Sequence, residues 1–122
     1  MEIEKPRKLS KILVCIRKRP LTNKEIKKGY KDIIEVTNEE SIVIKEEKVK
    51  LDLTKFVENH NFTFDLAFNE QHDNFIVYEQ TVKPMVDFAL EGGRVSCFAY
   101  GQTGSGKTYT MIGNEKAPGI YV

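Results

Sequence analysis

The chain has 122 residues, of which 40% are hydrophobic and 30% charged, which is the length of one domain and the composition of a soluble globular protein. Residues 1–31 carry eleven Lys or Arg against three Glu, a balance of +8, and the remainder carries eight against fifteen, a balance of −7. The basic amino end is either a solvated tail or a patch for acidic partners such as nucleotide phosphates, an acidic protein surface or nucleic acid. Because the sequence has no signal peptide and no run of about twenty apolar residues, we expect a cytosolic protein without a membrane partner.

The cysteines and histidines are expected to have no catalytic role. Cys15 and Cys97 lie in apolar runs and are predicted to be buried, reduced thiols, because no second Cys or His is placed to make either one a nucleophile or a metal ligand. His60 and His72 stand among polar residues and are predicted to lie at the surface.

The first predicted element is a strand over residues 9–16, whose continuous apolar run indicates burial on both faces. Pro20 ends it, because proline cannot donate to a sheet ladder. Arg17, Lys18 and Arg19 follow the strand directly, and three cations there either meet an anion or lie on the surface. Residue chemistry leaves both interpretations open.

A short helix and a hairpin are predicted next. Thr22 or Asn23 can cap a helical turn that Gly29 ends. β-branched residues in 32–36 and 41–45 flank a polar turn and predict a hairpin. The charged stretch 46–55 alternates apolar and polar residues, which indicates an exposed strand or a long hairpin tip.

Residues 62–68 alternate aromatic or apolar with polar or small side chains, which predicts a strand with one face in the core. Asp73 or Asn74 can cap the helix that follows. Apolar residues recur at helical spacing over 75–91, but Pro84 interrupts them. Proline inside a helix costs about 3 kcal/mol, so we predict two helices, with Pro84 in the first turns of the second.

A glycine-rich loop dominates the carboxyl end. Residues 101–108 fit the phosphate-loop pattern G-x-x-x-x-G-K-[ST] at every fixed position. An apolar run at 95–100 predicts the strand before it, and residues 109–112 continue a helix that Gly113 stops. In such a loop the backbone N–H groups face the phosphates, Lys107 supplies a positive charge and the Thr108 hydroxyl is a ligand of Mg²⁺. The alternative to a phosphate-binding loop is a turn whose only role is to join a strand to a helix.

The sequence of residues 98–111, FAYGQTGSGKTYTM, closely resembles the phosphate-loop segment of kinesin motor domains. The resemblance implies an α/β, P-loop NTPase-like fold with a central sheet flanked by helices, and ATP or ADP with Mg²⁺ as cofactors. It implies catalytic roles for Lys107 and Thr108. The residues expected to bind nucleotide are Arg17, Arg19, Pro20, Gly101, Gln102, Thr103, Gly104, Ser105, Gly106, Lys107, Thr108 and Tyr109.

Within that set, the Arg-x-Arg-Pro segment at 17–20 resembles the one that borders the adenine in kinesins. Arg17 and Pro20 would line the base pocket with Arg19 nearby. Tyr109 supplies a ring of the kind that packs on the adenine in this family, although a core tyrosine is the alternative. The segment 114–120 resembles the loop that interrupts the second kinesin helix.

A second resemblance indicates a particular class of kinesins. Residues 50–56, KLDLTKF, with Glu58 and Asn59 following, are similar to the extended second loop of kinesin-13, the internal-motor class that depolymerises microtubules. That class carries Lys-Val-Asp at the tip. The chain differs in having Leu51 in place of Val, which keeps an apolar residue between a cation and an anion. The resemblance implies that Lys50, Leu51 and Asp52 contact tubulin.

The resemblance also shows what the sequence lacks. A kinesin motor domain is longer than this chain, and the Asn-x-x-Ser-Ser-Arg and Asp-x-x-Gly switch segments do not occur in it. We therefore expect residues 1–8 to be a basic, neck-like extension and 9–122 to be the amino-terminal portion of a motor domain. These residues would bind nucleotide without completing hydrolysis, because phosphoryl transfer depends on the positioning that the switches provide.

The sequence thus predicts part of an ATP-dependent, microtubule-stimulated motor of the depolymerising type, at microtubules and the spindle. We expect no nucleic-acid partner, and a homodimer could form only through regions outside these residues. A walking transport kinesin and a tubulin-binding protein that does not hydrolyse ATP are the alternatives.

Overall fold

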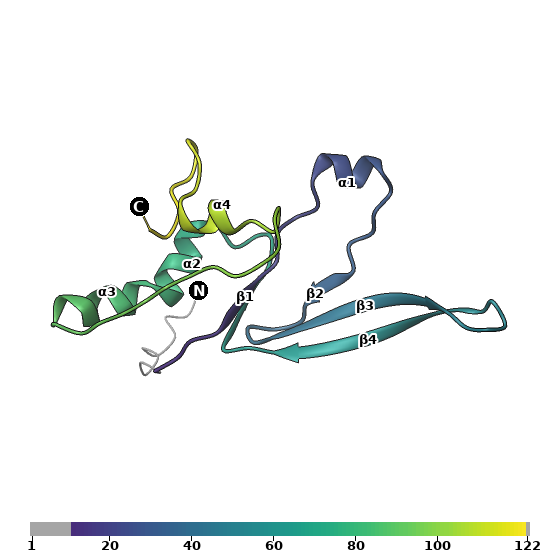
Figure 1. Ribbon diagram of the computed structural model, residues 1–122, viewed down its shortest axis with the longest axis horizontal. Helices are drawn as coiled ribbons and strands as arrows, with labels where there is room; N and C mark the ends of the chain where they lie inside the picture. Colours follow the sequence, from purple (N-terminus) through teal and green to yellow (C-terminus); the bar gives the residue numbers. More distant parts are fainter. Residues whose placement is uncertain (1–10, 122) are drawn as a thin grey trace. The chain divides into compact units, whose positions relative to one another are not determined.

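A computed structural model describes residues 11–121, which fall into two compact units (Figure 1). One unit is formed by Val14–His72. The other contains residues 73–121 together with 11–13. The predicted extension at 1–8 and the start of the first predicted strand lie outside the described residues.

A two-stranded parallel sheet begins the first unit. Strand β1 (Cys15–Arg17) pairs with β5 (Leu66–Phe68), with Ile16 opposite Ala67. The strand is shorter and less buried than the apolar run predicts, because β5 is its one strand partner among residues 11–121 and leaves Ile12 and Val14 exposed. It ends at Arg17, three residues before Pro20, as predicted.

The predicted hairpin is confirmed as a three-stranded antiparallel sheet in the order β2-β3-β4. It consists of β2 (Ile34–Val36), β3 (Ser41–Val49) and β4 (Lys55–Thr63). Strands β3 and β4 pair over their full length, from Ser41 opposite Thr63 to Val49 opposite Lys55. Figure 1 shows them as a long ribbon that closes in a narrow tip, so the charged stretch forms the end of an extended hairpin.

Helix α1 (Asn23–Lys27) starts at a capping box. The Thr22 hydroxyl accepts a hydrogen bond from the Glu25 N–H at 3.2 Å, and the Glu25 carboxylate accepts one from the Thr22 N–H at 3.0 Å. This reciprocal pair satisfies two of the helix's free donors. The helix ends just before Gly29, whose φ is +78°, as predicted.

The single strand predicted over 62–68 is wrong. Strand β4 ends at Thr63, and the chain then passes to β5 in the other sheet. Backbone hydrogen bonds hold this crossing on both sides, from Phe64 N–H to the Glu40 carbonyl and from Asp65 N–H to the Val14 carbonyl. Leu66, Ala67 and Phe68 are buried, whereas Phe62 is exposed, so the alternating pattern spans two sheets.

The second unit contains the two helices predicted around Pro84. Helix α2 (Asn74–Thr81) is capped by the Asp73 carboxylate, which accepts from the Ile76 N–H at 2.9 Å. Helix α3 (Lys83–Leu90) begins with Pro84 in its first turn, where a missing N–H costs no intrahelical bond. The cap at Asp73 and the break into two helices at Pro84 are both confirmed.

The strand predicted at 95–100 is not formed. No strand of residues 11–121 pairs with this stretch, which is extended and leaves Phe98 and Tyr100 exposed. A buried central strand requires ladder partners and packing on both faces, and the described part of the chain supplies neither here. The helix after the loop is present as α4 (Lys107–Met111), and Gly113, with φ +83°, follows it.

The burial predicted for the two cysteines is wrong, and both histidines have partners at the surface. Cys97 is exposed and Cys15 half-buried, and neither forms a disulfide bond within the described residues. His60 lies 2.8 Å from the Glu46 carboxylate across the hairpin. His72 accepts a hydrogen bond from the Asn69 N–H and packs edge-on against Phe68.

Within residues 11–121, none of the helices has both the length and the apolar character needed to span a bilayer.

The buried strand β5 predicts a sharp contrast between two leucines. Leu66 is 2% exposed, whereas Leu51 at the hairpin tip is fully exposed. Leu66→Ala should lower the free energy of unfolding by about 2–5 kcal/mol, because it removes packed atoms and leaves a cavity. Leu51→Ala is the matched control and should change it by less than about 0.5 kcal/mol. Urea unfolding of both variants provides the measurement, and equal effects would contradict this placement of the core.

Candidate nucleotide-binding site

The phosphate loop owes its shape to two glycines in the left-handed region. Gly104 has φ +83° and Gly106 has φ +104°, a conformation that side chains with a Cβ rarely adopt. At Gly101 a Cβ would lie 2.5 Å from the Ser105 hydroxyl oxygen, so a larger residue there would require the Ser105 side chain to move. The two left-handed glycines therefore shape the turn that leads into helix α4.

Lys107 and Thr108 occupy the first turn of α4. The Lys107 ammonium donates to the Gly101 carbonyl at 2.5 Å, so its side chain lies back along the loop. Thr108 is exposed, and Tyr109 is exposed over about two-fifths of its surface. A cation and a hydroxyl therefore belong to the helical turn that follows the glycine-rich loop, and their roles toward phosphate and Mg²⁺ stay predictions.

The segment 17–20 is held in its own unit by contacts from each of its cations. Arg17 donates to the His72 carbonyl at 3.1 Å. Arg19 makes a two-pronged contact to Glu25 at 2.7 and 3.2 Å and also donates to the Pro20 carbonyl. The Arg19 guanidinium, helped by the capping bonds of Thr22, lowers the pKa of Glu25 from 4.5 to about 2.

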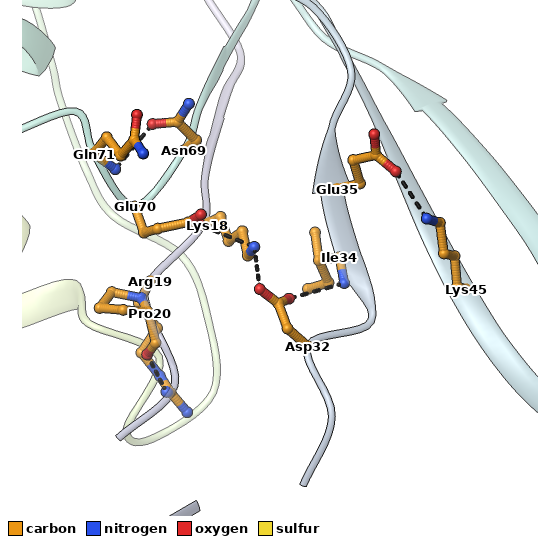
Figure 2. Close-up of polar contacts among 10 residues, drawn as sticks. All are labelled: Lys18, Arg19, Pro20, Asp32, Ile34, Glu35, Lys45, Asn69, Glu70 and Gln71. Carbon is orange, nitrogen blue, oxygen red and sulfur yellow. Dashed lines mark hydrogen bonds and ion pairs between the residues drawn. The ribbon is translucent and has the colours of Figure 1, made fainter. Parts of the chain in front are cut away.

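Lys18 is the most enclosed of these cations, with a side chain only 10% exposed. Its ammonium lies 2.7 Å from Asp32 and 2.8 Å from Glu70, and Figure 2 shows it reaching from the strand end toward both carboxylates. Burial acts against the charged form of Lys18, but the bonds to Asp32 and Glu70 outweigh it and raise the pKa of Lys18. The same bonds lower the pKa values of both acids.

The hairpin tip displays the residues expected to contact tubulin. Lys50, Leu51 and Asp52 are all exposed, and the Lys50 ammonium lies 5.5 Å from the centre of the Phe56 ring. Asp52 also has a structural task, because its carboxylate accepts from the Thr54 N–H at 3.0 Å. That bond lowers the pKa of Asp52 and helps to close the turn.

A charge network crosses the stem of the same hairpin. Glu46, Glu58 and His60 offer ligand atoms within 4.8 Å of one another. Lys48, however, forms ion pairs with both carboxylates, and His60 lowers the pKa of Glu46. We interpret these groups as paired surface charges.

Two sets of predicted site residues lie in different units. Gly101–Tyr109 belong to the second unit, whereas Arg17, Arg19 and Pro20 belong to the first. The structure describes the geometry of each set separately, so the adenine pocket formed by both sets stays a prediction.

Comparison with known proteins identifies the family of this chain. The profile of the kinesin motor domain matches residues 17–122. The chain belongs to the kinesin motor domain family. The match covers the Arg-x-Arg-Pro segment, the hairpin and the phosphate loop together.

Relatives of this kinesin agree with that assignment. Kinesin-like protein KIF24 is 46% identical over 113 residues in Homo sapiens and 45% identical over 113 residues in Mus musculus. Each alignment covers 93% of this chain and 8% of the relative. The kinesin chain thus spans less than a tenth of the length of these curated relatives.

Solved structures show the same fold. A KIF14 structure with ADP in complex with a microtubule matches with a TM-score of 0.72 and 34% identity, over 90% of this chain and 30% of that chain. The structure of a fast kinesin matches with a TM-score of 0.75 and 31% identity, over the same shares. These matches confirm the α/β kinesin motor fold predicted from the sequence.

Sequence reasoning misses two residues of this kinesin that the structure singles out. The sequence presents Lys18 as one of three adjacent cations, and its distant partners Asp32 and Glu70 carry no local signal. It presents Asn74 only as a helix cap, but Asn74 is the buried polar residue of the described chain, at 3% exposure. Asn74 ends the polar run 69–74, so no local signal distinguishes it from its polar neighbours.

The Lys18 bridge predicts a pH-dependent contribution to stability. Lys18→Met should lower the free energy of unfolding by about 1–3 kcal/mol near neutral pH, because two carboxylates lose their shared donor. Because both acids have lowered pKa values, this stabilisation is present above their ordinary values of 3.8 and 4.5 and is lost as pH falls further. The gap between wild type and variant should therefore shrink in acid.

Lys31→Met is the control for that experiment. Lys31 also pairs with a carboxylate, Glu47, at 2.7 Å, but both side chains are well exposed. Exposed pairs contribute about 0–1 kcal/mol. Unfolding by urea at several pH values measures both variants, and an equal, pH-independent loss would contradict a special role for Lys18.

Proposed function

We propose that this chain supplies the nucleotide-binding portion of an ATP-driven microtubule motor of the kinesin-13, depolymerising class. The observation that carries the proposal is the loop geometry, in which left-handed Gly104 and Gly106 lead directly into a helix that begins with Lys107 and Thr108. Membership of the kinesin family supports a nucleotide triphosphate as the ligand, since the matched KIF14 structures are complexes with ADP or with AMP-PNP.

In this proposal the chain's own groups divide the work of binding. The Ser105 N–H donates to the Gln102 carbonyl at 3.1 Å within the loop, so the other N–H groups of residues 101–106 would face the phosphates. The Lys107 ammonium would leave the Gly101 carbonyl to neutralise them. Arg17, Arg19, Pro20 and Tyr109 surround the base. Lys107 and Thr108 would stabilise the negative charge that develops on the phosphate oxygens during phosphoryl transfer.

The residues present also fit a magnesium ion. Thr108 offers an exposed hydroxyl oxygen next to the phosphate-binding lysine, and Mg²⁺ prefers oxygen ligands from a few protein groups and the phosphates. When bound, the ion would neutralise phosphate charge. Thr108 would hold it at the start of α4.

Turnover would need groups that this chain does not carry. The chain covers 30% of the matched kinesin structures, and no switch segment occurs in its sequence. We therefore propose that residues 9–122 are the amino-terminal portion of the motor domain and residues 1–8 a basic extension. Microtubule-stimulated ATP hydrolysis would then belong to the complete motor.

The depolymerising activity is proposed from the hairpin tip. Lys50, Leu51 and Asp52 present a cation, an apolar side chain and an anion at the exposed end of a long two-stranded arm. Tubulin is the partner proposed for this tip, and a kinesin match in complex with a microtubule supports that choice. The site of action would be cytoplasmic microtubules, including the spindle.

The nucleotide proposal is tested by Lys107→Ala in the complete protein. Loss of a charged donor to phosphate is worth about 1.5–3 kcal/mol, which corresponds to roughly a tenfold to hundredfold weaker affinity for Mg-ATP. Lys116→Ala is the control, since Lys116 is an exposed lysine of the same unit. Fluorescent-nucleotide titration gives both affinities, and an unchanged value in Lys107→Ala would refute the proposed site.

The depolymerising proposal is tested by replacing Lys50, Leu51 and Asp52 together with Ala. Filament shortening by the complete protein should fall at least about tenfold while nucleotide affinity is unchanged, because the tip lies outside the nucleotide-binding residues. Such a loss corresponds to about 1.4 kcal/mol or more of interaction. Filament length under the microscope is the measurement.

Two controls sharpen that test. Lys55→Ala with Val57→Ala alters exposed residues of the hairpin stem and should leave shortening intact. Asp52→Asn keeps the acceptor for the Thr54 N–H while removing the charge, so it separates turn closure from contact with tubulin. Full shortening by the triple variant would show that the assignment of the tip is wrong. Wild-type protein that leaves filament length unchanged would favour a walking kinesin, and shortening without ATP would favour a binder that uses no nucleotide.

A further inference from the structure

Asn74 is a buried polar residue that touches the helix after the phosphate loop. It is the first residue of α2 and is 3% exposed. Its amide nitrogen donates to two backbone carbonyls, that of Tyr109 at 3.0 Å and that of Pro118 at 3.1 Å. One carboxamide therefore joins the start of α2 to α4 and to the segment that returns after it.

The Tyr109 carbonyl depends on this contact. In a continuing helix it would accept from the N–H four residues on, at Gly113. The Gly113 N–H instead donates to Thr108 at 3.1 Å. Asn74 supplies the donor that the helix does not.

The next carbonyls of α4 are satisfied in the same external way. Those of Thr110, Met111 and Ile112 accept from the N–H groups of Ile120, Tyr121 and Gly119 at 2.9, 2.9 and 2.8 Å. The last four carbonyls of a helix have no partner within it. Here the Asn74 amide and the N–H groups of residues 119–121 donate to all four of these carbonyls.

Helix α4 cannot hold its position by itself. It has five residues, and isolated helices shorter than about 12–15 residues are marginal in water. Its first turn carries Lys107 and Thr108, so whatever fixes α4 also fixes those two side chains. Asn74 is the one side chain in the described region that is seen to bond both α4 and the returning segment.

We propose that Asn74 is a positioning residue for the phosphate loop: its buried carboxamide, bonded to the Tyr109 and Pro118 carbonyls, sets the placement of Lys107 and Thr108. The inference rests on the proposed nucleotide function for its consequence. Asn74 itself touches no phosphate; it acts through the backbone of α4.

The test compares Asn74→Asp with Asn61→Asp in the complete protein. The carboxylate introduced by Asn74→Asp would face two carbonyls and could donate to neither at neutral pH. Asn61 is exposed on β4, so the control makes the same charge change elsewhere. Asn74→Ser, which keeps one donor, serves in place of Asn74→Asp if that variant does not fold.

The first readout is amide hydrogen exchange and needs no nucleotide. Exchange at Thr110 and Ile112, whose N–H groups donate to the Gly106 and Thr108 carbonyls, should be at least about tenfold faster in the Asn74 variant, which is about 1.4 kcal/mol of lost protection. In the control it should stay within about twofold of wild type. Unchanged exchange at these amides would overturn the inference, whether or not the protein binds nucleotide.

The second readout is the ratio of ADP affinities with Mg²⁺ and with EDTA. A displaced Thr108 hydroxyl should reduce this ratio at least severalfold in the Asn74 variant, whereas general destabilisation would lower both affinities alike and leave the ratio unchanged. An unchanged ratio would overturn the positioning role. If wild type binds no ADP at all, the proposed function fails, and the exchange result alone decides whether Asn74 holds α4.

Discussion

The left-handed backbone at Gly104 and Gly106 is the constraint on which the rest of the site depends. Side chains with a Cβ are strained in that conformation, so the loop turns into α4 without strain only if glycine occupies both positions. The turn brings Lys107 and Thr108 to the first turn of the helix. A point charge and a hydroxyl then stand beside backbone donors without any large rearrangement.

Each unit of the chain stabilises its own part of the proposed site by a different kind of interaction. Around the phosphate loop the contacts are backbone carbonyls of α4 that receive donors from Asn74 and from residues 119–121. Around the Arg-x-Arg-Pro segment they are ion pairs, of which the enclosed Lys18 bridge differs from the exposed pairs of the hairpin. Bonds between neutral groups are less sensitive to salt than exposed charges, so the two parts should respond differently to ionic strength.

Local patterns were sufficient to predict most elements of the fold. The glycines and prolines that punctuate the chain predicted the ends of α1 and α4 and the break between α2 and α3, because their effects act within a turn. The phosphate loop and the exposed hairpin tip were likewise readable from adjacent residues. The kinesin resemblance added the family, which comparison confirmed.

Predictions that depend on distant partners were less successful. The alternation over 62–68 could not reveal that the chain leaves one sheet and joins another at Phe64 and Asp65. The apolar run at 95–100 predicts a strand, but a strand also needs a neighbour, and none of the described residues pairs with it. Lys18 and Asn74 find their partners 14 to 52 and 35 to 44 positions away, where no local spacing rule applies.

The most direct test of the central claim follows the loop amides themselves. In the complete protein labelled with ¹⁵N at glycine, lysine and threonine, Mg-ATP should shift the backbone amide signals of Gly104, Gly106, Lys107 and Thr108, because their N–H groups would bond phosphate oxygens. Saturating, magnesium-dependent shifts at these four positions are the predicted result. Binding of Mg-ATP that leaves all four signals in place would contradict the account.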